Sequence, residues 1–119
     1  MKILVIDDEQ VIRSSVKLRL EHQGHEVIVA PDGEIGVLIA KENPDLDIVI
    51  SDWNMPRKDG LTALGEIKAL IPAVRAFLMT GDYTGDASLM KRAAGLGIEQ
   101  VLSKTDPDTR EFFDSLAKG

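Results

Sequence analysis

Four short and mostly apolar runs recur along the chain, and each leads into polar residues that could carry chemistry. The runs are residues 3–6, 48–51, 77–79 and 101–103. They are rich in Val, Ile and Leu and are continuous rather than alternating, which is typical of strands buried on both faces of a parallel sheet. Residues 25–30 have a similar composition and follow a glycine, so we interpret them as another strand. The pattern therefore predicts five parallel strands.

Stretches with apolar residues at helical spacing separate these runs. Ile12, Val16 and Leu20 fall on one helical face, and Gly24 is a stop signal. Further helices are predicted over residues 34–42, 61–71 and 84–95, which end at Asn43-Pro44, Pro72 and Gly95. Strands and helices thus alternate along the whole chain. This order favours right-handed crossovers, with helices covering both faces of the sheet.

The last segment has a strong helix-start signal. Asp106 can accept backbone N–H groups as a cap, and Pro107 can occupy the first helical position without losing a needed donor. Phe112, Phe113 and Leu116 would then face inward. We therefore expect a fifth helix after the fifth strand.

Composition and charge narrow the class of protein. The 119 residues are enough for one domain, which we expect to span residues 1–119, and 44% of them are hydrophobic. The net charge of −6 disfavours direct binding to nucleic acid or to an anionic membrane, because both require clustered Lys and Arg. The chain has no cysteine and no apolar stretch long enough for a signal peptide or a membrane span. We expect a cytoplasmic protein.

Polar residues follow four of the predicted strands. If these strands are parallel neighbours, the residues meet at the carboxyl-terminal edge of the sheet, where open α/β sheets bind their ligands. The set is Asp7, Asp8, Asp52, Thr80 and Lys104. Any of the acids alone could be an ordinary helix cap or turn residue. Five such residues at one edge are better explained as a functional site.

The chemistry of this set favours a magnesium ion and a phosphoryl group. Carboxylates held a few ångströms apart repel one another, and a bound Mg²⁺, which prefers oxygen ligands, removes that cost. A backbone carbonyl in the loop after Asp52 could add a further ligand. A carboxylate can attack phosphorus to form an acyl phosphate. Lys104 and the Thr80 hydroxyl could then contact two phosphoryl oxygens.

The loop over residues 52–60, together with Asp7-Asp8, Thr80-Gly81 and Lys104, closely resembles the receiver domain of bacterial two-component response regulators. The resemblance covers essentially the whole chain, and the motifs stand in the order that this family has. It implies a flavodoxin-like three-layer α/β sandwich, with a five-stranded parallel sheet of order 2-1-3-4-5 and five helices.

The resemblance also implies a function. Asp52 would accept a phosphoryl group from a phosphohistidine on a histidine kinase or phosphotransfer protein. Asp7, Asp8, Asp52 and the main-chain carbonyl of Asn54 would hold Mg²⁺. Thr80 and Lys104 would contact the aspartyl phosphate, and a conformational change would pass the signal to a downstream protein target that the sequence does not name. We expect self-phosphorylation from a donor and self-dephosphorylation, and no metabolic enzyme.

Two departures from the family pattern keep an alternative open. Receivers usually carry an aromatic residue where this chain has Val101, and a proline where it has Thr105. A receiver fold that acts as a phosphate-independent docking module is therefore the second hypothesis. An aspartate-nucleophile phosphatase is less well supported, because it would want an acid at the position of Asn54. A flavin-binding flavodoxin is weaker still, since acids stand where its phosphate loop would be.

Overall fold

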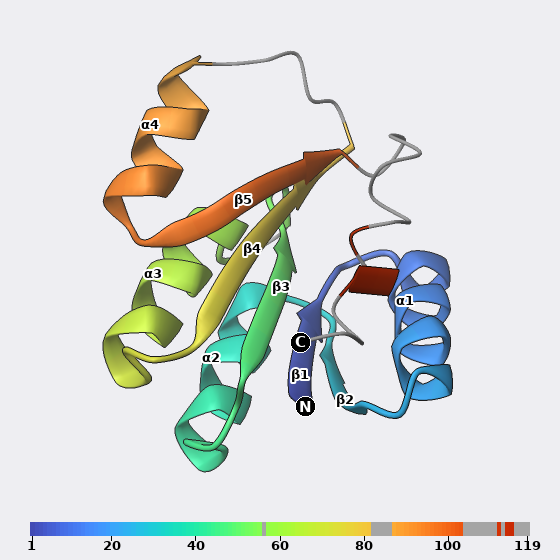
Figure 1. Cartoon of the computed structure of the whole chain (residues 1–119). Helices are drawn as coiled ribbons and strands as arrows, with labels where there is room; N and C mark the ends of the chain where they lie inside the picture. Colours follow the sequence, from blue (N-terminus) through green and yellow to red (C-terminus); the bar gives the residue numbers. More distant parts are fainter. Residues whose placement is uncertain (56, 82–86, 104–111, 113, 116–119) are drawn as a thin grey trace.

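Five parallel strands form one sheet in the order β2-β1-β3-β4-β5, which confirms the predicted order (Figure 1). The computed structural model describes residues 1–55, 57–81, 87–103, 112, 114 and 115. Each strand is parallel to its neighbours. The strands are β1 (Lys2–Ile6), β2 (Glu26–Ala30), β3 (Ile48–Asp52), β4 (Arg75–Thr80) and β5 (Ile98–Ser103).

In the described part of the chain, helices α1 to α4 cover the sheet from two sides, so the molecule has three layers (Figure 1). They are α1 (Gln10–His22), α2 (Gly33–Glu42), α3 (Gly60–Leu70) and α4 (Ala87–Gly95). Helix α1 lies on one face, whereas α2, α3 and α4 lie on the other. Most of the predicted fifth helix, including its start at Asp106-Pro107, Phe113 and Leu116, lies outside the described residues. Phe112 is described, and its ring contacts that of Phe77 at a centroid distance of 4.7 Å, with the two rings tilted by 59°.

The core has two parts because successive side chains of a strand point to opposite faces. In β1, Leu4 and Ile6 belong to a buried cluster with residues of α2, α3 and α4. Ile3 and Val5 belong to a second cluster, which α1 covers with Val16 and Leu20. The central strands are buried on both sides, as the continuous apolar runs predict.

The observed strand boundaries differ most from the predicted ones in β4 and β5. These strands begin at Arg75 and Ile98, before the apolar runs over residues 77–79 and 101–103 that predicted them. Each strand starts at the rim, where Arg75 and Glu99 form an ion pair with 2.9 Å between Nε and Oε2. Apolar runs mark only the buried interior of a strand, so its charged end was missed. Among the described residues, no helix combines the length and apolar character that crossing a membrane requires.

Candidate functional site

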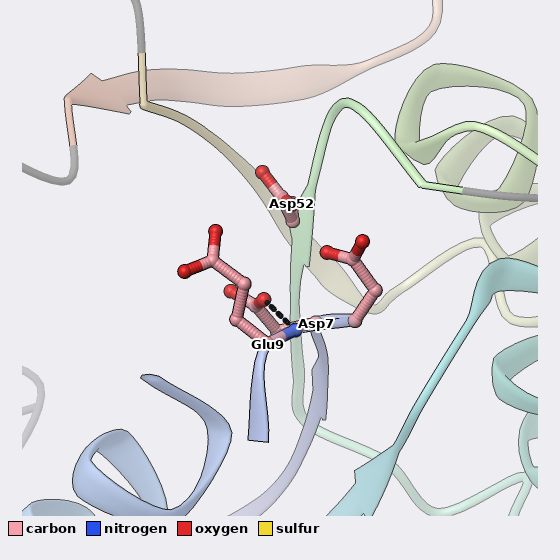
Figure 2. Close-up of side chains that lie close together, drawn as sticks. Asp7, Glu9 and Asp52 are labelled. Carbon is pink, nitrogen blue, oxygen red and sulfur yellow. Dashed lines mark hydrogen bonds between the residues drawn. The ribbon is translucent and has the colours of Figure 1, made fainter. Parts of the chain in front are cut away.

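Four carboxylates gather at the carboxyl-terminal edge of the sheet, where β1 and β3 end side by side. Asp7 and Asp8 follow β1, and Asp52 is the last residue of β3. Ile6 pairs with Ser51 across the two strands, so Asp7 and Asp52 stand at the same level. One oxygen from each of Asp7, Asp8, Glu9 and Asp52 lies within 4.8 Å of the others. In Figure 2 the carboxyl groups of Asp7, Glu9 and Asp52 point toward a common region.

The four acids form an inner wall and an outer rim. Asp7 is 0% exposed and Asp52 is 5% exposed, whereas Asp8 and Glu9 are exposed. Buried acids are held in place by the packing around them. Exposed acids leave the cluster open to solvent. The arrangement therefore combines two fixed carboxylates with access for a small ligand.

Hydrogen bonds fix the turn that joins β1 to α1. The Asp7 main-chain N–H donates to Ala30 at 3.1 Å, which extends the β1–β2 pairing by one residue. The Glu9 main-chain N–H donates to Oδ1 of Asp7 at 2.8 Å (Figure 2). Nη1 of Arg13, one turn into α1, donates to the Asp7 carbonyl at 2.6 Å. The inner acid is thus held by its main chain and by its side chain.

The loop after Asp52 folds back so that its end, at Gly60, lies against the main chain of Asp52. The main-chain N–H of Trp53 donates to the Met79 carbonyl, and the Trp53 carbonyl accepts from the Gly60 N–H; both bonds are 2.8 Å. A Cβ atom at Gly60 would lie 2.0 Å from the Asp52 carbonyl oxygen. Only glycine fits this close approach. Asn54 is exposed in the loop, and its carbonyl stays a predicted ligand.

A second set of contacts ties this loop to α2. Arg57 has a positive φ of 70°, and its Nη1 lies 3.3 Å from Oδ2 of Asp32. Asp32 is the N-cap of α2, and its other oxygen accepts from the Ile35 N–H at 2.9 Å. A Cβ atom at Gly33 would lie 2.5 Å from the Lys58 carbonyl oxygen. The loop is therefore held from both ends, which gives the edge a defined shape before any ligand binds.

Thr80 stands beside the acid cluster, on the strand next to Asp52. Asp52 pairs with Met79 across β3 and β4, so Thr80 is one residue beyond it. Thr80 is 1% exposed and ends β4. Lys104 follows Ser103, the last residue of β5, but it lies outside the described residues. The roles predicted for both residues remain predictions.

The donors in the cluster fit a hard divalent cation. All four are carboxylates, and oxygen is the ligand that Mg²⁺ prefers. Sequence reasoning missed Glu9, because a glutamate at a helix start reads as an ordinary favourable charge near the helix dipole. The signal that could have found it is its place directly after Asp7-Asp8. Val101, which stands where receivers usually carry an aromatic residue, lies in β5. Its side chain packs against the buried apolar cluster beneath α2, α3 and α4.

Comparison with protein families gives a match over residues 3–114, to the family described as the response regulator receiver domain. A probable chemotaxis protein CheY of Rhizobium etli is 36% identical over 105 residues, which cover 87% of this chain and 81% of the relative. A protein-glutamate methylesterase/protein-glutamine glutaminase of Rhodospirillum rubrum is 38% identical over 106 residues. These residues are 88% of this chain but 28% of that enzyme.

Solved structures give the same match. A response regulator receiver domain protein of Clostridium thermocellum superposes with a TM-score of 0.83 at 35% identity, covering 98% of this chain and 92% of the other. Chemotaxis protein CheY4 of Vibrio cholerae superposes with a TM-score of 0.84 at 25% identity, covering 98% and 96%. The likeness in structure therefore extends over nearly the whole of both chains.

Proposed function

The chain belongs to the response regulator receiver domain family and is a phosphorylation-dependent signalling switch, and we propose that Asp52 receives the phosphoryl group in a Mg²⁺-dependent reaction. One observation carries the proposal. Asp52 is 5% exposed, yet its carboxylate lies within 4.8 Å of those of Asp7, Asp8 and Glu9. Like charges held this close favour a bound cation, and a cation is what phosphoryl transfer to a carboxylate needs.

For the transfer, the protein has mainly to position the reacting groups and to neutralise the charge on the phosphoryl oxygens. A carboxylate oxygen of Asp52 attacks the phosphorus of a donor phosphohistidine, the phosphorus–nitrogen bond breaks, and the imidazole leaves with a proton from solvent. The product is an aspartyl phosphate. Asp7, Asp8 and the Asn54 carbonyl would hold Mg²⁺, which when bound neutralises phosphoryl oxygens. Water later attacks phosphorus, the bond between phosphorus and the Asp52 oxygen breaks, and inorganic phosphate leaves, which restores the carboxylate.

The new phosphoryl oxygens bias the switch. Thr80 ends the neighbouring strand one residue beyond Asp52, so its hydroxyl is suited to donate to one of these oxygens. Lys104 follows the next strand and would pair with another. A phosphoryl group that makes contacts with Thr80 and Lys104 in one conformation stabilises that conformation and raises its population. Because Val101 stands where an aromatic residue is usual, parts of the molecule other than an aromatic side chain at this position carry the signal.

We further propose that a histidine kinase or phosphotransfer protein in the cytoplasm supplies the phosphoryl group and that another protein reads the result. The family accounts for both roles. Similar regions form 12% of a sensor kinase/phosphatase of Vibrio cholerae and 38% of a transcription regulator of Bordetella pertussis. The docking-module alternative is less well supported, because it gives the acid cluster no role.

The test is intact-mass analysis after incubation with Mg²⁺ and acetyl phosphate. One added phosphoryl group is expected on the parent protein and none on the Asp52→Asn variant. Asp45→Asn is the matched control, since it makes the same change in an exposed residue at the opposite edge of the sheet and should still be phosphorylated. An adduct that persists in Asp52→Asn would refute the assignment. No adduct with acetyl phosphate or with a phosphohistidine donor would favour the docking module.

A further inference from the structure

Three consecutive peptide units form the turn that leads from β1 into α1, and each makes a hydrogen bond. The unit before Asp7 donates through the Asp7 N–H to the Ala30 carbonyl at 3.1 Å. The unit before Glu9 donates through the Glu9 N–H to Oδ1 of Asp7 at 2.8 Å. The unit between Asp7 and Asp8 accepts through the Asp7 carbonyl, from Nη1 of Arg13 at 2.6 Å. The first two bonds join the turn to β2 or to itself, whereas the third comes from a side chain of α1.

The middle unit governs how the Asp8 carboxylate lies relative to that of Asp7. Because a peptide unit is planar, holding its carbonyl limits ψ of Asp7 and φ of Asp8. These angles set the direction in which the Asp8 side chain leaves the main chain. Asp7 is buried and held by packing, but Asp8 is exposed, so its direction depends more on the backbone. A bond to the middle unit therefore orients the exposed acid relative to the buried one.

The position of Arg13 favours this contact rather than the stability of its own helix. Arg13 is the fourth residue of α1, and its main-chain N–H donates to the Glu9 carbonyl in the first turn. A cation near the amino-terminal end of a helix is unfavourable for the helix dipole. Its side chain is half-buried, and it takes part in no ion pair with the described residues. The group that its guanidinium holds is the Asp7 carbonyl.

We propose that Arg13 is a positioning residue of the phosphorylation reaction, which orients Asp8 relative to Asp7 so that the acids can hold Mg²⁺ together. This inference rests on the proposed function and assigns no new ligand to the cation site. Arg13 acts through the Asp7 carbonyl. Its charge alone would act in the other direction, because a guanidinium near the acids repels a divalent cation. Positioning and charge therefore predict opposite effects when the side chain is removed.

The experiment is a Mg²⁺ titration followed by the fluorescence of Trp53, the only tryptophan, which is adjacent to Asp52. Arg13→Met keeps much of the apolar length of the side chain but removes its charge and its donors. Positioning predicts that the Mg²⁺ concentration at half-saturation rises about tenfold, as when a group that orients a metal ligand is removed. Charge alone predicts that this concentration falls. A purely structural role in α1 predicts no change at temperatures where the variant is folded.

Arg13→Lys sharpens the test, because lysine keeps the charge and can donate one bond, but lacks the planar fork of the guanidinium. We expect partial rescue, with a half-saturation concentration between those of Arg13→Met and the parent protein. Phosphorylation by acetyl phosphate gives a second readout. In Arg13→Met its rate should fall about tenfold at low Mg²⁺ and largely recover at saturating Mg²⁺, since Asp52 itself is unchanged.

Arg19→Met is the matched control, because it makes the same change further along α1, in a residue that pairs with Asp114. It should leave the half-saturation concentration unchanged. If the parent protein binds Mg²⁺ and Arg13→Met binds it equally well or more tightly, the inference fails and the proposed function stands. If the parent protein does not bind Mg²⁺, both fail.

Discussion

The two edges of the sheet treat charge in opposite ways. At the amino-terminal edge, acids stand next to cations. Lys2 Nζ is 3.0 Å from Asp45 and 3.7 Å from Glu26, and Arg75 is 2.9 Å from Glu99. The carboxyl-terminal edge also holds one such pair, Arg57 and Asp32 at 3.3 Å, but where β1 and β3 end four carboxylates lie within 4.8 Å of one another. Opposite charges are thus paired at the amino-terminal edge, whereas like charge is concentrated where β1 and β3 end.

The difference separates what folding needs from what function needs. Pairs of opposite charge at a solvated rim are close to neutral for stability, and they impose no cost. A cluster of like charges opposes the folded state and is tolerated only where the surroundings fix it in place. Here the fixing groups are on the backbone, around Asp7 and in the loop that returns to Asp52. The carboxyl-terminal edge is therefore the more rigid one, and it carries the concentrated negative charge.

The largest expected effect comes from breaking the rigid backbone of that edge. In Gly60→Ala the new Cβ would lie 2.0 Å from the Asp52 carbonyl oxygen and 3.0 Å from Leu78. We expect a loss of about 3 kcal/mol in the free energy of unfolding, as for overpacking that the backbone must absorb. Urea unfolding measures it. Gly95→Ala, where a Cβ would meet nothing within 4 Å, is the control and should unfold like the parent protein.

A smaller effect, with opposite signs at the two edges, is expected from removing charge. Asp8→Asn should raise the free energy of unfolding of the metal-free protein by about 1 kcal/mol, because it relieves repulsion at a separation of a few ångströms. Arg75→Met should lower it by about 0.5 kcal/mol, which is typical of an exposed ion pair. Both changes should shrink in high salt. Urea unfolding at two salt concentrations decides the matter, and equal signs for the two variants would contradict the comparison.

Much of this contrast could be predicted from the sequence. Apolar runs that lead directly into acids placed Asp7, Asp8 and Asp52 at the ends of strands, and the parallel order brought those ends together. These features are local, since they need only strand periodicity and the rule that parallel strands end at the same edge.

The remainder depends on tertiary structure. Glu9 lies in the cluster within a turn in which its main-chain N–H donates to Asp7, and its place directly after Asp7-Asp8 signals nearness but not this turn. The positive φ of Arg57 follows from the closing of the loop against α2, and nothing in the residue itself favours it. The ion pair between Arg75 and Glu99 depends on the register of two strands, so the true starts of β4 and β5 were missed.

The smallest expected effect is a pH dependence at the amino-terminal edge. His25 directly precedes β2, is 9% exposed, and has its Nδ1 3.2 Å from the amino group of Met1. Burial, and secondarily the positive charge of that amino group, lower the pKa of His25 below the usual 6.5.

The sign of the effect follows from which state binds the proton more readily. The unfolded chain takes up a proton on His25 near pH 6.5, whereas the folded protein resists it until the pH is lower. Stability from this residue is therefore complete above that pH and is lost as the pH falls toward the folded pKa. His25→Gln should flatten the dependence of the unfolding free energy between pH 7 and 5, and His22→Gln, at an exposed position, should not. A profile unchanged by His25→Gln would contradict the assignment of this pH dependence to His25.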